Sequence, residues 1–327
     1  MNDFGGLLRQ ITQRRILVIG DVMLDHYCFG DATRISPEAP VPVVNVSSEA
    51  DTVGGAANVA HNLATLGAAV EVLGGIGDDA NGGKLREHLA RNRIAFDERF
   101  LLGGVKTITK TRVIVRNQQL CRLDHEEDPG TYRRVLLGEI PLARLEEKIA
   151  AADGVILSDY AKGVLTTEAI QAITRQVRRH GKFIALDPKP ASGVQFEDLD
   201  LITPNRKEAL ELAGTPEPLA AELDLAAICA TIWRKYRSRN LVVTLGADGM
   251  QISKGGEVGA RIPTAARQVY DVSGAGDTVI AALTLALTSG ASLETAAHFA
   301  NAAAGVVVGK LGTATVTPSE LLAYLGS

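Results

Sequence analysis

The chain has 327 residues, of which 46% are hydrophobic and 4% aromatic, and its formal net charge is −4. This length allows one large α/β domain or two ordinary ones, with a core of Ala, Val, Leu and Ile. No basic block is present, which argues against a nucleic-acid partner. Cys28, Cys121 and Cys229 are dispersed and fit neither a disulfide framework nor a zinc site. With no apolar run of about 18 residues, we expect a soluble, cytoplasmic protein that does not enter a membrane.

Residues 15–20 form a short apolar run that predicts a strand buried on both faces of a sheet. Asp21 and Asp25 follow it. Ligands of open α/β sheets gather beyond the carboxyl ends of strands, so a carboxylate here can hold sugar hydroxyls. Turn chemistry is the alternative, because Asp often bonds its own backbone.

Two segments, about 29–48 and 107–123, depart from the rhythm of alternating strands and helices. Prolines exclude a helix in the first, and residues 41–46 alternate as a half-buried strand does. The second alternates in the same way. Together they predict a small accessory sheet that acts as a lid or, through its exposed edge, as a contact between two subunits.

Gly54 and Gly55 open a predicted helix over 57–66 that carries Asn58. Paired glycines at a helix start indicate a close backbone approach to a ligand, and Asn58 can donate and accept toward hydroxyls. A plain helix start is the open alternative.

The second half of the chain repeats strand–helix units, which predicts a mostly parallel sheet with helices on both faces. We find no domain boundary apart from the lid and expect one domain over residues 1–327. Strands are predicted at 70–75, 154–158, 183–187, 201–203 and 241–245, and helices at 81–91, 166–179, 219–236 and after Gly276 and Leu293.

Polar side chains follow several of these strands. Lys162 and Lys189 each lie near a strand end, where a lysine can hold an anionic group or be merely solvated. Asn205 and Glu208 lie in the first turn of a predicted helix, where they can form an outer shell for Mg²⁺ or a simple capping pair. The glycine-bearing turn at 244–249 can carry a nucleotide or begin a hairpin.

The segment 271–278, Asp-Val-Ser-Gly-Ala-Gly-Asp-Thr, leads into a predicted buried helix. Its glycines let backbone N–H groups approach an anion, and the helix start favours negative charge. Asp277 would repel an anion that it touched. We therefore expect Asp277 to take a proton from a nucleophile that attacks a phosphorus held by those N–H groups. An N-capping aspartate is the alternative.

Several common site patterns are missing from the sequence. There is no G-x-x-x-x-G-K-[ST] loop, the third glycine of the dinucleotide fingerprint is lacking, and there is no G-x-S-x-G elbow. The six histidines form no metal-ligand pair. Phosphoryl transfer by a non-Walker mechanism is the interpretation that remains.

Taken together, the motifs resemble the ribokinase-like, or PfkB, family of carbohydrate kinases over nearly the whole chain. Residues 54–58 resemble its first signature and residues 271–278 its second. The resemblance implies a ribokinase-like, doubly wound, mostly parallel α/β sheet with helices on both faces and a small β-sheet lid. It also implies ATP as co-substrate, Mg²⁺ as cofactor, and a homodimer formed through the lid strands.

The resemblance further implies residue roles. Asp277 is then the base that deprotonates a sugar hydroxyl, and the backbone of Gly274, Ala275 and Gly276 forms the anion hole. The implied sugar ligands are Asp25, Gly54, Gly55 and Asn58; the implied ATP-binding residues are Asn205, Glu208, Thr244, Gly246 and Asn301, with Asn205 and Glu208 also organising Mg²⁺; and Asp271 and Ser273 correspond to positions for a monovalent cation such as K⁺.

Four segments, 20–25, 34–42, 117–124 and 158–163, resemble the D-glycero-β-D-manno-heptose 7-phosphate kinases within that family. A substrate that carries a 7-phosphate needs basic side chains, for which Arg34, Arg112, Lys162 and Lys189 are the candidates. The sequence has no H-x-G-H motif of the nucleotidyltransferase that is fused to this kinase in many bacteria. We therefore expect the stand-alone kinase, without synthesis of the sugar nucleotide.

Two other functions remain open. One is a kinase for another phosphosugar, such as fructose 6-phosphate or tagatose 6-phosphate. The other is a non-catalytic sugar or nucleotide sensor, which is disfavoured because Asp277, Asn205 and Glu208 are all present.

Overall fold

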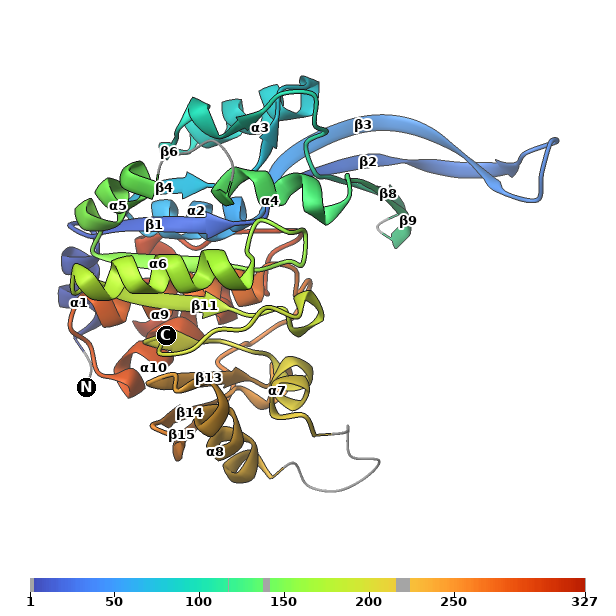
Figure 1. The fold of residues 1–327 in the computed structure, drawn as a ribbon. Coiled ribbons are helices and arrows are strands. Elements are labelled where there is room, and N and C mark those ends of the chain that lie inside the picture. The colour runs from blue at the N-terminus through green and yellow to red at the C-terminus, as the bar shows by residue number, and fades with distance from the viewer. Residues whose placement is uncertain (1–2, 117, 138–141, 216–223, 327) are drawn as a thin grey trace.

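The computed structural model describes residues 3–116, 118–137, 142–215 and 224–326. Over these residues, nine strands form a central sheet in the order β15-β14-β13-β12-β11-β10-β1-β4-β6 (Figure 1). The strands from β13 to β6 are parallel, and β14 and β15 add an antiparallel edge. Their bounds are β1 (Arg15–Gly20), β4 (Ala69–Leu73), β6 (Ile94–Phe96), β10 (Gly154–Ser158), β11 (Phe183–Asp187), β12 (Leu201–Ile202), β13 (Asn240–Thr244), β14 (Met250–Lys254) and β15 (Glu257–Ile262).

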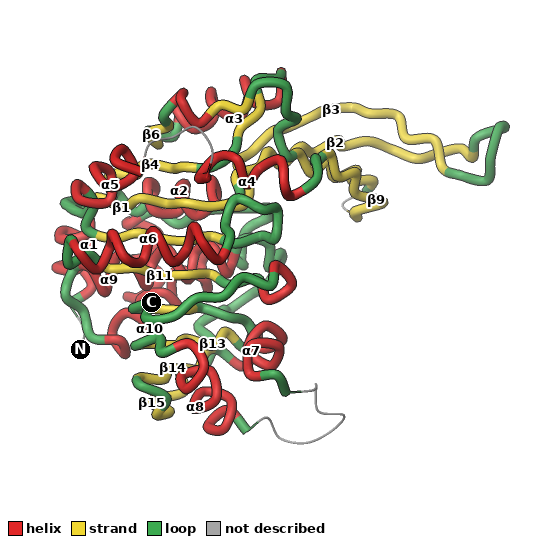
Figure 2. Tube along the Cα trace, viewed as in Figure 1, coloured by secondary structure: helices red, strands yellow, loops and turns green. Residues whose placement is uncertain are grey.

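Helices cover both faces of this sheet, as Figure 2 shows. In β1, Ile16 and Val18 pack into one hydrophobic core, and Leu17 and Ile19 pack into the other. This alternation is the result of the strand period of two. The first face carries α1 (Phe4–Ile11), α2 (Ala56–Thr65), α3 (Ala80–Arg91), α9 (Ala275–Thr288), α10 (Leu293–Val307) and α11 (Pro318–Gly326); the second carries α4 (Pro129–Leu137), α5 (Leu142–Ala151), α6 (Thr167–Arg179), α7 (Arg206–Ala213) and α8 (Leu225–Tyr236).

The predicted doubly wound α/β fold is confirmed, and the predicted strands at 15–20, 154–158 and 183–187 have the bounds expected. The predicted helix at 219–236 begins in residues outside the described ranges, and its described part is α8. Short elements complete the fold: β5 (Ile76–Gly77), which pairs with β7 (Leu101–Leu102), and the 3₁₀ turns η1 (Glu98–Phe100), η2 (Pro190–Ser192) and η3 (Gly246–Asp248).

A second sheet, which we call the lid for short, projects from the central one (Figures 1 and 2). Its strand order is β3-β2-β8-β9, from β2 (Val22–Ile35), β3 (Pro42–Gly55), β8 (Thr109–Val115) and β9 (Gln118–His125). The two long strands β2 and β3 are antiparallel and reach farthest from the central sheet.

The first predicted lid segment, about 29–48, was too short, whereas the second, 107–123, lies close to β8 and β9. Strand β2 begins at Val22, so Asp25 lies within a lid strand and not in the loop after β1. Val22 and Leu24 are fully buried, and the exposed positions that reveal a strand begin farther along β2. In the second segment, β8 and β9 pair with each other as antiparallel strands.

Across the described part of the chain, every helix is too short or too polar to span a bilayer.

Candidate active site

A cleft of about 380 Å³ lies where the lid meets the carboxyl ends of the central strands. The lid contributes Asp25 and Arg112, and the ends of β11 and β13 contribute Asp187 and Thr244. The predicted site residues that line this cleft are Asp25, Gly54, Gly55, Asn58, Arg112, Asn205, Glu208, Thr244, Ser273, Gly274, Gly276 and Asp277.

Asp277 is buried in the first turn of α9, and both of its carboxylate oxygens accept hydrogen bonds. Asn58 Nδ2 donates to Oδ2 at 2.6 Å, and the hydroxyl of Tyr160 donates to Oδ1. The Asp277 side chain does not cap α9, whose N-cap is Gly274. The capping alternative raised by the sequence is therefore wrong, and the carboxylate is presented to the cleft.

The pKa of Asp277 is raised to about 6, chiefly because burial disfavours the charged form. The hydrogen bonds from Tyr160 and Asn58 oppose this shift, and the nearby carboxylate of Asp25 adds to it. A general base whose pKa lies near the pH of the reaction is largely ionised and still has a high affinity for the proton that it takes. The environment thus suits a general base.

Gly274 adopts a left-handed conformation with φ of +76° at the start of α9. A Cβ at this position would lie 2.8 Å from Asn58 Nδ2, so glycine also permits the close approach of Asn58. The first backbone N–H groups of a helix have no acceptor within the helix, and those of Gly276 and Asp277 open α9 beside the cleft. This helix start can bind an anion.

The lid wall of the cleft holds an ion pair. Arg112 Nη1 lies 2.6 Å from Asp25 Oδ1, and both side chains are largely shielded from solvent. Burial raises the pKa of Asp25, and the charge of Arg112 opposes that shift. Lys110 and Arg122 line the same cleft and share Asp124 as a partner. Three cations therefore face the cleft from β8 and β9.

Asn205 and Glu208 form a reciprocal capping box at the start of α7. Asn205 Oδ1 accepts from the Glu208 amide, and Glu208 Oε2 accepts from the Asn205 amide, both at 3.0 Å. Glu208 Oε1 lies 3.0 Å from Lys189 Nζ. The capping alternative is therefore realised, while both side chains also line the cleft.

Burial and the neighbouring carboxylates of Asp277 and Glu208 raise the pKa of Asp187 well above its usual range. Asp187, Asn205 and Glu208 all line the cleft. Carboxylate and amide oxygens of this kind suit a hard divalent cation such as Mg²⁺, which keeps several of its waters.

A second, more apolar pocket of about 440 Å³ adjoins the cleft and shares Thr244 and Gly276 with it. Gly246, Ala275 and Asn301, all predicted from the sequence, line this pocket. Its apolar lining includes Met250, Val269, Val272, Val279 and Val308. An apolar slot beside a helix start suits the flat base of a nucleotide, with the phosphates of the nucleotide directed to Gly276.

Some predicted substrate ligands lie elsewhere. Arg34 is exposed on the distal part of β2, opposite Val43, and does not line the cleft. Lys162 is paired with Glu126 at 2.6 Å, and Lys189 reaches the cleft only through its contact with Glu208. Within the described residues, the cations that line the cleft are the predicted Arg112 and two that were not predicted, Lys110 and Arg122.

Tyr160 is a site residue that the sequence did not predict. Asp21, which is fully buried, accepts hydrogen bonds from the backbone amides of Tyr160, Lys162 and Val164 at 2.8–3.0 Å. It thereby shapes the loop after β10 so that the Tyr160 hydroxyl meets Asp277. The local sequence marks neither this loop geometry nor a partner that is 117 residues away.

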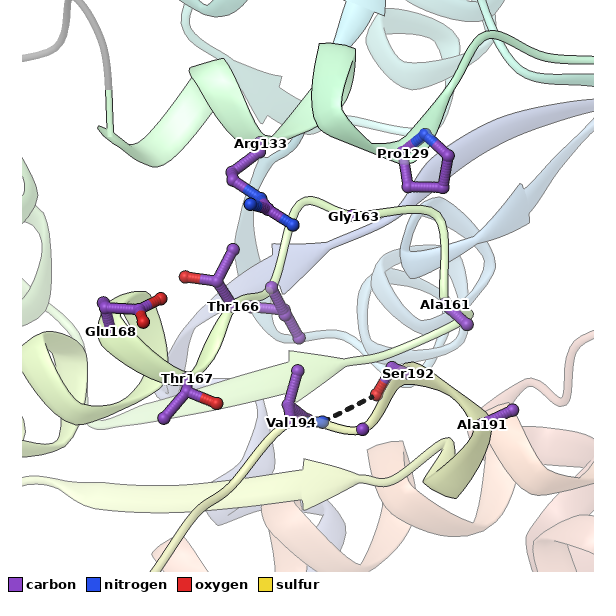
Figure 3. Close-up of a pocket in the computed structure, with 12 residues that line it drawn as sticks. Pro129, Arg133, Ala161, Gly163, Thr166, Thr167, Glu168, Ala191, Ser192 and Val194 are labelled. Carbon is purple, nitrogen blue, oxygen red and sulfur yellow. Dashed lines mark hydrogen bonds between the residues drawn. The ribbon is translucent and has the colours of Figure 1, made fainter.

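The same loop borders another cavity of about 380 Å³, shown in Figure 3. Its polar side chains include Thr166 and Ser192, which serve local structure. Thr166 caps α6 by accepting from the Ala169 amide, and Ser192 Oγ accepts from the Val194 amide, drawn as a dashed line in Figure 3. This cavity contains none of the predicted site residues.

Sequence comparison places the chain among known proteins. A family model described as pfkB family carbohydrate kinase matches residues 13–320. The chain is 40% identical to bifunctional protein HldE of Sulfurimonas denitrificans and 45% identical to that of Halorhodospira halophila, over 98% and 95% of its length. It spans 66% and 63% of these two proteins, slightly less than two thirds of their length.

Solved structures share the fold at low sequence identity. Ribokinase from Thermotoga maritima is 22% identical with a TM-score of 0.72, and phosphofructokinase-2 from Escherichia coli in complex with potassium is 20% identical with a TM-score of 0.75. Both comparisons cover 96% of this chain and 100% of the other. The family match along most of the chain shows that the chain belongs to the pfkB family of carbohydrate kinases.

Proposed function

We propose that this kinase transfers the γ-phosphoryl group of ATP to the anomeric 1-hydroxyl of D-glycero-β-D-manno-heptose 7-phosphate and forms the 1,7-bisphosphate. The observation that carries the proposal is that one cleft holds both a buried carboxylate, Asp277, and three lid cations, Lys110, Arg112 and Arg122. A base and a separate cationic wall suit a sugar that is already phosphorylated. The four segments that resemble heptose 7-phosphate kinases support the choice of sugar.

The reaction uses the groups of the cleft as follows. Asp277 takes the proton of the 1-hydroxyl, whose oxygen attacks the γ-phosphorus while the bond to the ADP oxygen breaks. The amides at the start of α9 face the phosphoryl oxygens. The Asn58 Oδ1 atom is buried without a partner among the described residues, so it is available to accept from a sugar hydroxyl.

Asn205 and Glu208, with Asp187 beside them, would hold Mg²⁺ through water. When bound, this ion supplies positive charge next to the phosphates. Thr244, Gly246 and Asn301 surround the position proposed for the nucleotide base. Asn301 also holds its wall in place, since its Nδ2 donates to Pro263 O at 2.7 Å.

The test is an ADP-release assay over a panel of phosphosugars, in which NMR identifies the phosphorylated position of the product. We expect the highest kcat/KM for the heptose 7-phosphate and a phosphate on its anomeric oxygen. A preference for fructose 6-phosphate or tagatose 6-phosphate would replace the heptose as substrate. Absence of ADP release with every sugar, in a folded protein that binds ATP, would favour the sensor.

We also propose a homodimer formed through the lid. Apolar side chains are exposed there, among them Ile35 at 62% and Val46 at 52%, and β3 and β9 are open edges of the lid sheet. Light scattering should give a dimer for the native chain and a monomer for the Ile35→Asp/Val46→Asp variant. Leu322→Asp, an exposed change on α11, is the control. A native monomer at micromolar concentration would contradict the proposal.

A monovalent cation beside Asp271 and Ser273 is the last part of the proposal. The Asp271 carboxylate accepts from the amides of Ser273 and Gly312 at 2.9 and 3.0 Å, and these bonds lower its pKa. A charged carboxylate held by two backbone amides can contribute a ligand to K⁺. Replacing K⁺ by tetramethylammonium at constant ionic strength should lower kcat, and equal rates in both salts would rule the site out.

A further inference from the structure

Two cross-strand pairs near the base of the lid place metal-ligating side chains together. In the β2–β3 ladder, His26 is opposite Asp51 and Cys28 is opposite Glu49. Side chains two residues apart on a strand share a face. His26 Nε2 accordingly lies 3.3 Å from Cys28 Sγ and 4.0 Å from Glu49 Oε2. Among the described residues, His26, Cys28 and Glu49 are the group of three whose ligand atoms all lie within 4.8 Å of one another.

Asp51 fixes the orientation of the imidazole. His26 Nδ1 donates to Asp51 Oδ1 at 2.6 Å, so the lone pair of the neutral ring is on Nε2 and faces Cys28 and Glu49. Lys84 Nζ lies 3.1 Å from the other oxygen of Asp51 and partly balances its charge. A carboxylate behind a histidine ring is the usual outer partner of a metal-bound imidazole.

The separations match those of a tetrahedral zinc site. Zinc bound to sulfur at about 2.3 Å and to nitrogen or oxygen at about 2.0–2.2 Å holds its ligand atoms roughly 3.4–3.6 Å apart. The 3.3 Å between His26 Nε2 and Cys28 Sγ is within a few tenths of an ångström of this, while the 4.0 Å between His26 Nε2 and Glu49 Oε2 is longer and Glu49 must move inward to bind. The His26 side chain is 16% exposed and that of Glu49 is 59% exposed, so Glu49 can rotate inward and water can reach the fourth position.

We propose that His26 Nε2, the Cys28 thiolate and the Glu49 carboxylate bind a Zn²⁺ ion on the lid, with water as the fourth ligand. The thiol gives up its proton to solvent when zinc binds. The charges of the thiolate and Glu49 then neutralise the ion. A thiolate and an imidazole favour zinc strongly over Mg²⁺, which prefers oxygen ligands.

This site is separate from the kinase cleft. Asp25 precedes His26 and points to the opposite face of β2, where it lines the cleft. His26 lines a different cavity of about 170 Å³, together with Lys84 and His125. Zinc would therefore tie β2 to β3 behind the sugar-binding face and stabilise this part of the lid. The inference does not depend on which sugar the kinase uses.

No zinc site is expected from the sequence, because its cysteines are dispersed and its histidines form no metal-ligand pair. His26 and Cys28 are two residues apart, but Glu49 and Asp51 reach them only through the register of β2 with β3. That register shifts between Phe29 and Gly30, just beyond the cluster. A slip of one residue at His26 would place Glu49 and Asp51 on the other face.

The test is a titration of the tag-free, full-length chain with Co²⁺, a spectroscopic substitute for Zn²⁺, in a phosphine reductant without nucleotide. We expect one equivalent to bind with thiolate-to-cobalt charge-transfer absorption that added Zn²⁺ abolishes. Zn²⁺ should also raise the melting temperature by about 2 °C or more. Absence of this absorption in the native chain would overturn the proposal.

Matched variants locate the site. Cys28→Ser and His26→Gln should lose the absorption while circular dichroism shows a folded protein. Cys121→Ser changes the exposed lid cysteine, on β9, and should keep it. Retention of the absorption in Cys28→Ser, or its loss in Cys121→Ser, would exclude the site as described.

Discussion

The hydrogen bond from Tyr160 to Asp277 leads to a specific prediction about how kcat depends on pH. The bond stabilises the charged carboxylate, so it lowers the pKa of Asp277 against the effect of burial. Tyr160→Phe removes the donor and leaves the ring in place. The pKa of Asp277 must then rise from about 6, and the variant needs a higher pH to ionise its base.

The size of the shift follows from the energy of the bond. A hydrogen bond to a charged group contributes roughly 1.5–3 kcal/mol. Since one pKa unit corresponds to about 1.4 kcal/mol, the pKa should rise by about one to two units. The acid limb of kcat would move from about pH 6 to about pH 7–8, and kcat at pH 7 would fall roughly two- to tenfold. Activity should recover near pH 9.

The assay is the pH profile of kcat at saturating ATP and sugar. Ionisation of the substrate phosphates affects both proteins equally, so the difference between the profiles reports the enzyme. Tyr132→Phe is the matched control, because its buried hydroxyl donates to Lys106 O and has no contact with Asp277. An unchanged acid limb in Tyr160→Phe, or an equal shift in Tyr132→Phe, would refute the reasoning.

Three further changes test the cleft. Asp277→Asn should lower kcat by about 10²–10⁴-fold while calorimetry shows ATP binding retained, and turnover within a few-fold of native would exclude it as the base. Gly274→Ala puts a Cβ 2.8 Å from Asn58 Nδ2 on a residue whose φ is +76°. The free energy of unfolding, measured by urea titration, should fall by about 1–3 kcal/mol. An unchanged free energy of unfolding would show that the loop adapts to the methyl group. Arg122→Ala should raise KM for the phosphosugar about tenfold without raising KM for ATP. The control is Arg116→Ala, at a residue outside the cleft, which should change neither KM. If the two variants had the same KM for the phosphosugar, Arg122 would not belong to the substrate site.

Much of the central sheet could be predicted from local sequence. Strands such as Arg15–Gly20 and Gly154–Ser158 are buried on both faces, so each appears in the sequence as a short apolar run. The glycine-bearing loop before α9 and the buried helix itself were predicted for a similar reason, because glycines and an apolar run can be read directly in the sequence. These features depend on neighbours in the chain.

The lid was predicted less well. At the base of β2 the strand is buried on both faces, which hid its beginning, and Asp25 was consequently placed in a loop. Arg34 was chosen through a resemblance of short segments, and such a resemblance does not show how far a strand carries a side chain from the cleft.

The sequence by itself thus determined the order of the elements and the chemical groups available to the site. Only the tertiary structure decided which of them meet. Tyr160 reaches Asp277 through a loop that is held by buried Asp21, and His26 meets Glu49 through the register of two long strands. Such contacts join residues far apart in the chain, so their geometry is set by packing and pairing that no local pattern records.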